Sequence, residues 1–172
     1  MKQIKDEMVA FLKADEIEDL ISNLAQRIEN DYEGREITWI CPLRGSMHFV
    51  ADLMRKVRLP QQIDFVFVTS SGKSGVIKIV KDISANIRGK DVIIVEEIID
   101  TGRTLSFLRD RLIASGPASL KIVTLLDKPA RREIPLRADY ICKTIDDRYV
   151  VGYGMDSEEL GRNYPDIYNL KN

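Results

Sequence analysis

The sequence predicts an α/β protein with a doubly wound, mostly parallel sheet. Short apolar runs alternate with segments whose apolar residues fall at helical spacing, which is the pattern of strands joined by helices. One run, Val92–Val95, is apolar at every position, as is typical of a parallel strand covered on both faces. The chain has 172 residues, of which 44% are apolar and 31% charged, so it is long enough to bury a core. No repeat or linker divides it, and a single domain over residues 1–172 is expected.

Periodicity and turn residues predict the elements of the first third of the chain. A helix begins near Asp15, carries apolar residues at helical spacing and ends at Gly34. The apolar run Ile37–Leu43 is a buried strand. The next helix carries its apolar residues over 49–57 and is ended by Pro60.

The rest of the chain continues the alternation. A strand over 63–68 is followed by a Ser/Gly-rich loop over 69–75 and by a half-exposed edge strand over 76–80. The remaining expected elements are a strand over 92–95, a helix over 105–113 ended by Gly116, and strands over 120–126 and 149–151. In sheets of this kind ligands bind beyond the carboxyl ends of the strands, so the loops there are the candidates for function.

Charge and composition exclude several classes of protein. The 26 Lys and Arg residues nearly balance 27 Asp and Glu, which argues against a dedicated nucleic-acid-binding protein. The apolar runs are far shorter than the ~20 residues of a membrane span, and the charged segment after Met1 does not resemble a secretory signal. We therefore expect a cytoplasmic protein without membrane association, in which Cys41 and Cys142 are reduced core residues.

Residues 92–104 carry the most informative pattern for chemistry. A buried strand is followed by Glu96, Glu97 and Asp100, and then by Thr101–Thr104 at the start of a helix. Free N–H groups at a helix N-terminus bind phosphate, and the glycine in this turn allows the backbone to approach it closely. Three carboxylates beside an anion site indicate Mg²⁺ binding or recognition of sugar hydroxyls. In the alternative interpretation Asp100 only caps the helix and the glutamates are solvated.

The segment Val92–Thr104 resembles the phosphoribosyl-pyrophosphate motif of the type I phosphoribosyltransferases. Four further segments resemble, in the same order, the hypoxanthine-guanine branch of that family; they are Leu43–Ser46, Leu126–Arg132, Tyr149–Asp156 and Arg162–Asp166. The resemblance covers roughly residues 10–168. It implies the type I phosphoribosyltransferase fold, with a small hood contributed by about residues 1–15 and 128–172. It also implies transfer of the phosphoribosyl group of phosphoribosyl pyrophosphate to a 6-oxopurine base.

The resemblance assigns a role to each side chain around the reacting atoms. Asp100 is the implied catalytic base near purine N7, a role that a partly desolvated carboxylate suits. The implied phosphate ligands are Thr101, Gly102, Arg103 and Thr104. Glu96 and Glu97 match the acidic pair that holds the ribose hydroxyls, directly or through Mg²⁺.

Further matches concern the purine and the leaving pyrophosphate. Lys128 matches the lysine that donates to purine O6, unless it is only a solvated strand-end residue, and Tyr149 and Val150 match the residues that contact the ring. Asp156 matches a Mg²⁺ ligand, or else it caps a turn. The implied pyrophosphate ligands are Leu43, Arg44, Gly45, Arg162 and either Arg132 or Arg131, with a cis peptide between Leu43 and Arg44. His48 is expected to be structural or solvated.

The sequence departs from the family pattern at two places. The acidic pair is usually Glu-Asp, whereas here it is Glu96-Glu97. The loop over 69–75 is shorter than the family's mobile loop and lacks its tyrosine, so Ser70 or Ser71 is expected to replace the usual Ser-Tyr pair. Such a lid excludes water, and a short one is expected to shield the reaction less well.

The leading functional hypothesis is a Mg²⁺-dependent purine-salvage transferase that acts on hypoxanthine and guanine. Two alternatives stay open, namely a non-catalytic nucleotide-binding regulator of the same fold and a xanthine-preferring transferase. A homodimer or homotetramer is expected by resemblance alone.

Overall fold

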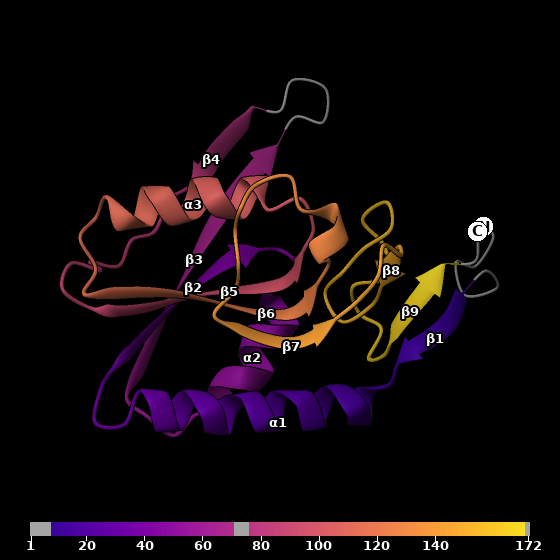
Figure 1. Cartoon of the computed structure of the whole chain (residues 1–172), viewed down its shortest axis with the longest axis horizontal. Helices are drawn as coiled ribbons and strands as arrows, with labels where there is room; N and C mark the ends of the chain where they lie inside the picture. Colours follow the sequence, from indigo (N-terminus) through magenta and orange to yellow (C-terminus); the bar gives the residue numbers. More distant parts are fainter. Residues whose placement is uncertain (1–7, 71–75, 171–172) are drawn as a thin grey trace.

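The structure, a computed structural model, describes residues 8–70 and 76–170. Its main sheet has six strands in the order β4-β3-β2-β5-β6-β7 (Figure 1). These strands are β2 (Ile37–Leu43), β3 (Gln61–Ser70), β4 (Ile77–Lys81), β5 (Asp91–Ile99), β6 (Ser119–Asp127) and β7 (Tyr140–Thr144). Only β3 and β4 pair antiparallel in this sheet, and its other neighbours are parallel. The predicted mostly parallel α/β sheet is confirmed.

Helices cover both faces of this sheet (Figure 1). They are α1 (Ala14–Asp31), α2 (Met47–Lys56) and α3 (Arg103–Ile113). Trp39 and Ile93 belong to the core shared with α1 and α2, whereas their neighbours Ile40 and Ile94 belong to the core shared with α3. Successive residues of a strand point to opposite faces, so a central strand between two helical layers has to be apolar throughout.

A second, antiparallel sheet lies beside the ends of β6 and β7 (Figure 1). It has the order β1-β9-β8 and consists of β1 (Met8–Leu12), β8 (Val150–Val151) and β9 (Ile167–Leu170). These strands come from the two terminal segments for which a hood is expected. In the described part of the chain no helix is long and apolar enough to span a membrane.

Two predicted boundaries are wrong. Strand β5 continues from Val95 to Ile99, because Glu96 and the following residues keep pairing with β6. Strand β3 continues to Ser70, which pairs with Ile77 of β4, so the first part of the predicted loop is strand. The other predicted loop serine, Ser71, lies outside the described residues.

Candidate active site

Two adjoining cavities lie where the parallel strands β5 and β6 end. The smaller, of about 130 Å³, is lined by the end of β5, the turn after it and the first residues of α3. The larger, of about 190 Å³, lies between that turn and residues 149–156. Ile98 and Asp100 line both cavities. A ligand that fills both therefore has to pass over Asp100.

The turn after β5 presents a helix N-terminus to the smaller cavity. Helix α3 begins at Arg103, after Gly102 with a φ of 82°. This left-handed conformation favours glycine, and the first N–H groups of the helix are left without intrahelical acceptors. Asp100 does not cap α3, which has no side-chain cap, so the capping interpretation is wrong. The backbone geometry suits a phosphate group, and the roles of Thr101, Gly102, Arg103 and Thr104 stay predictions.

The carboxyl group of Asp100 is half exposed at the junction of the two cavities. Its Oδ1 atom lies 3.0 Å from Nε of Arg131, whose side chain is also half exposed. Nε of Arg131 is also 3.7 Å from a carboxyl oxygen of Asp147. Asp100 therefore has a cationic partner at the surface. A ligand that binds to the Asp100 carboxylate has to share it with Arg131.

Glu96 and Glu97 are half-buried near the end of β5, and Oε2 of Glu96 is fully buried, so the solvated interpretation of these acids is wrong. Burial, reinforced by the charge of Glu97, raises the pKa of Glu96 well above its usual value. Burial raises the pKa of Glu97 to about 7, against the opposing effect of Arg162. The Oε2 atom of Glu96 has no hydrogen-bond partner within the described residues. A donor such as a sugar hydroxyl, or a cation, would satisfy this oxygen.

The loop after β2 fits tightly against this acidic pair. The peptide between Leu43 and Arg44 is cis, as the resemblance implies. A Cβ atom on Gly45 would lie 1.7 Å from Oε1 of Glu97, so any larger residue at position 45 requires this carboxyl group to move. A Cβ atom on Gly154 would lie 2.0 Å from the carbonyl oxygen of Gly45. The two glycines thus bring three chain segments together at one corner of the larger cavity.

Replacing Gly45 with alanine should displace the Glu97 carboxyl group and lower kcat/KM by at least about tenfold, since positioning contributes strongly to catalysis. Steady-state kinetics would measure this loss. Shortening the acid in the double variant Gly45→Ala, Glu97→Asp should recover part of it. Gly89→Ala is the control: its positive φ makes the substitution strain the backbone, but nothing lies within 4 Å of the added Cβ atom, so kcat/KM should stay unchanged. Full activity of Gly45→Ala would contradict the packing described above.

Lys128 is buried, with 7% of its surface exposed, so it is not the solvated lysine of the alternative interpretation. It lines the larger cavity together with Tyr149 and Val150. The Tyr149 ring is half exposed, and its hydroxyl group donates to the carbonyl oxygen of Asp156 at 3.1 Å. The predicted purine contacts are thus gathered in one cavity with Asp100 and Glu97.

The predicted pyrophosphate arginines Arg44 and Arg162 are linked by an acid. Glu159 forms an ion pair with Arg44 and lies 3.5 Å from Nη2 of Arg162. Arg162 also pairs with Asp156 at 2.7 Å. The other carboxyl oxygen of Asp156 accepts the N–H of Glu159 at 2.9 Å, so Asp156 does cap the turn as its alternative interpretation proposed.

Arg132 does not join this group. Its guanidinium group donates to the carbonyl oxygen of Asp100, to Asp127 and to the carbonyl oxygen of Leu136. The guanidinium nitrogens are therefore already hydrogen-bonded to protein oxygens. The Arg132 side chain lines a cavity that neither Arg44 nor Arg162 lines. His48 is half-buried, and its ring lies 5.9 Å from that of Tyr153, in a structural position as expected.

Sequence reasoning missed two acids of this region. Asp127 lies in the segment Leu126–Arg132, where the resemblance gives it no role, although an acid beside a run of basic residues is a signal for an ion pair. Glu159 follows Glu158 in a turn where both residues have positive φ, and no local signal predicts that a charged pair adopts it. Ile98 and Met155 complete the apolar lining of the larger cavity.

A family model described as a phosphoribosyl transferase domain matches residues 10–158. The chain therefore belongs to the phosphoribosyltransferases, the class that the fold and the turn after β5 indicate. Within that class it belongs to the hypoxanthine-guanine phosphoribosyltransferase family. The family member of that name from Streptococcus thermophilus is 40% identical over 161 residues, which are 90% of this chain and 89% of the relative.

Another relative is larger. The bifunctional protein TilS/HprT of Listeria monocytogenes is 41% identical over 165 residues, 94% of this chain, and the chain spans only 26% of that relative's length. The solved structure of a variant hypoxanthine phosphoribosyltransferase from Trypanosoma cruzi, complexed with the product IMP, superimposes with a TM-score of 0.89 at 36% identity. That match covers 94% of this chain and 89% of the other.

Proposed function

We propose that the protein is a purine-salvage enzyme, which joins hypoxanthine or guanine to the ribose of phosphoribosyl pyrophosphate and releases pyrophosphate. The observation that carries this proposal is the gathering of Asp100, Lys128 and Glu97 in one cavity that adjoins the N-terminus of α3 through Asp100. A nucleoside monophosphate has its phosphate and its base at opposite ends of a ribose. Two cavities that share Asp100 suit such a ligand. The family relationship and the complex of a relative with IMP support the same substrate class.

Asp100 acts as the base in this proposal. Purine N9 bonds to the anomeric carbon as the bond to pyrophosphate breaks. The purine then loses the proton on N7, and the Asp100 carboxylate accepts that proton. Thr101–Thr104 hold the 5′-phosphate on the N–H groups of α3, which fixes the ribose relative to Asp100. A positioned base of this kind contributes about 10²–10⁴-fold to the rate.

Lys128 selects the purine. Its ammonium group donates to O6 of a 6-oxopurine, and a 6-amino group in that place would leave a buried ammonium without an acceptor. Tyr149 stacks on the purine face, and Val150 contacts the ring edge through its backbone. Arg44, Gly45, Leu43 and Arg162 surround the pyrophosphate.

The acidic residues Glu96, Glu97 and Asp156 suit a metal ion that binds together with the substrate phosphates. Among residues 8–70 and 76–170 no cluster of three or more His, Cys, Asp or Glu side chains is arranged to hold a metal ion. Mg²⁺ does not need one, since it keeps several waters and commonly binds one or two carboxylates together with substrate phosphates. Glu96 with its unpaired oxygen, Glu97 and Asp156 are the residues proposed to hold it. When bound, Mg²⁺ neutralises charge on the departing pyrophosphate.

A spectrophotometric assay with Mg²⁺ and phosphoribosyl pyrophosphate tests the proposal against its two alternatives. Hypoxanthine and guanine should both yield a nucleoside monophosphate. Product from xanthine alone would favour the xanthine-preferring transferase. Binding of IMP without any product would favour the non-catalytic regulator and overturn the proposal.

Replacing Glu159 with glutamine should lower the KM for phosphoribosyl pyrophosphate about two- to fivefold, because each exposed ion pair that the substrate has to displace is worth up to about 1 kcal/mol. Steady-state kinetics and pyrophosphate inhibition would both report the change. Glu158→Gln is the matched control, since Glu158 lies in the same turn with a positive φ. A higher KM in Glu159→Gln would show that this acid assists the substrate instead.

A cytoplasmic location and assembly as a homodimer or homotetramer belong to the same proposal and stay predictions. Size-exclusion chromatography with light scattering measures the assembly directly.

A further inference from the structure

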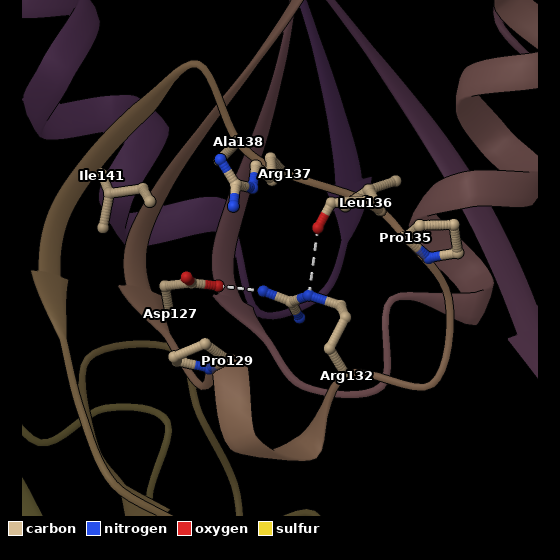
Figure 2. Close-up of a pocket in the computed structure, with 8 residues that line it drawn as sticks. All are labelled: Asp127, Pro129, Arg132, Pro135, Leu136, Arg137, Ala138 and Ile141. Carbon is tan, nitrogen blue, oxygen red and sulfur yellow. Dashed lines mark hydrogen bonds and ion pairs between the residues drawn. The ribbon is translucent and has the colours of Figure 1, made fainter.

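A third cavity lies close to the turn and is distinct from the two substrate cavities. It has a volume of about 560 Å³ and shares no lining residue with them. Figure 2 shows Arg132 reaching into it between Asp127, at the end of β6, and the backbone of Leu136. The side chains of Arg132 and Asp127 are only 12% and 10% exposed.

All three guanidinium nitrogens of Arg132 donate hydrogen bonds to protein oxygens. Nε donates to the carbonyl oxygen of Leu136 at 3.1 Å, and Nη2 donates to Oδ1 of Asp127. Nη1 donates to the carbonyl oxygen of Asp100. A buried arginine keeps its charge and needs a counter-ion, which Asp127 supplies. This leaves one end of the fork to hold the main chain of Asp100.

The same segment also contacts the next residues of the turn. The N–H of Glu133 donates to the carbonyl oxygen of Thr101 at 3.0 Å. A Cβ atom on Gly102 would lie 3.1 Å from Cδ of Arg132. Residues 132 and 133 therefore hydrogen-bond to the carbonyl oxygens of Asp100 and Thr101 and lie close to Gly102.

We propose that Arg132 is a positioning residue, which holds the main chain of Asp100 so that its carboxylate and the N–H groups of α3 keep a fixed spacing. The proposal rests on the proposed function, in which Asp100 is the base. Arg132 itself touches no substrate. Its effect passes through the carbonyl oxygen of Asp100, and Asp127 keeps the guanidinium group in place.

A purely structural role gives a different result from a positioning role. Loss of a stabilising ion pair lowers the melting temperature but leaves kcat of the folded enzyme unchanged. Loss of positioning lowers kcat of the folded enzyme. It also weakens the binding of IMP more than the binding of hypoxanthine alone, because IMP bridges the turn and the purine contacts.

Chemical rescue separates the two roles. Arg132→Ala removes the fork, and the cavity of about 560 Å³ gives a small cation access to the same place. We expect kcat of this variant to be lower by at least about tenfold, since orientation of the Asp100 carboxylate contributes effects of this order. Added n-propylguanidinium should raise kcat of the variant by at least about fivefold. n-Butylammonium, a cation without a planar fork, should restore much less.

Two further variants keep the test decisive if Arg132→Ala does not fold. Arg132→Lys keeps the charge and loses the fork, and Asp127→Asn keeps the shape and loses the counter-ion; both should lower kcat with a smaller loss of melting temperature. Arg109→Gln is the control, since Arg109 pairs with Asp110 on the exposed side of α3.

A kcat within about twofold of the parent in folded Arg132→Lys would overturn the inference, because a fork-dependent alignment predicts a larger change. So would n-propylguanidinium that raises the melting temperature without raising kcat. Asp100→Asn distinguishes this failure from failure of the proposed function. If Asp100→Asn is inactive while the Arg132 variants are active, only the positioning role fails, and if Asp100→Asn is fully active, the role of Asp100 as base fails.

Discussion

Replacing Asp100 with asparagine should lower kcat by about 10²–10⁴-fold, the usual contribution of a positioned general base. The amide cannot accept the purine proton, whereas it keeps the size of the side chain. The Kd of IMP, measured by titration calorimetry, should change by less than about threefold, because the α3 N–H groups and Lys128 still bind the nucleotide.

Asp147→Asn is the matched control. Asp147 is an exposed acid that also lies near Arg131, at 3.7 Å, but it does not line either substrate cavity. Its replacement should leave kcat unchanged. If Asp100→Asn kept kcat within about threefold of the parent, Asp100 would not be the base, since that loss is far below the expected contribution.

Replacing Lys128 with methionine should lower kcat/KM for hypoxanthine about ten- to a hundredfold, because a hydrogen bond to a charged group contributes about 1.5–3 kcal/mol. Methionine keeps a similar length and apolar stem in this buried position. The ratio of kcat/KM for hypoxanthine to that for adenine should fall, since the variant no longer penalises a 6-amino group.

Lys121→Met controls for the loss of a lysine, because Lys121 lies on β6, the strand that ends just before Lys128, beside Tyr140 and outside the lining of both substrate cavities. Competition between hypoxanthine and adenine in one reaction gives the ratio directly. An unchanged hypoxanthine-to-adenine ratio in Lys128→Met would show that another group recognises the substituent at purine C6.

The central part of this fold is predictable from sequence for a clear physical reason. Strand β2 and the start of β5 are buried on both faces, so their apolar runs mark them without any tertiary information. Helices α1 and α2 have one apolar face each and recognisable ends. Strand β8 lies within the strand predicted over 149–151. The four residues of β9 are too few for periodicity to identify, since this strand is defined by its pairing with β1 and β8.

The candidate site is predictable where a motif fixes local structure and less so where distant segments meet. The turn from Asp100 to Thr104 is set by neighbouring residues, and the structure places it as expected. The partners of Arg132 are set instead by the path of residues 132–136 behind the turn, which no spacing reveals. The contact between Gly45 and Glu97 likewise depends on how two strands end side by side.

A crystal structure of the protein with bound inosine monophosphate tests the central claim most directly. We expect the 5′-phosphate to lie on the backbone N–H groups of residues 101–104 and the Asp100 carboxylate to lie within about 3.2 Å of purine N7, the upper limit of a good hydrogen bond. The ring should stack on Tyr149, with O6 facing Lys128. A nucleotide that left the turn empty, or an Asp100 carboxylate directed away from the base, would contradict the account.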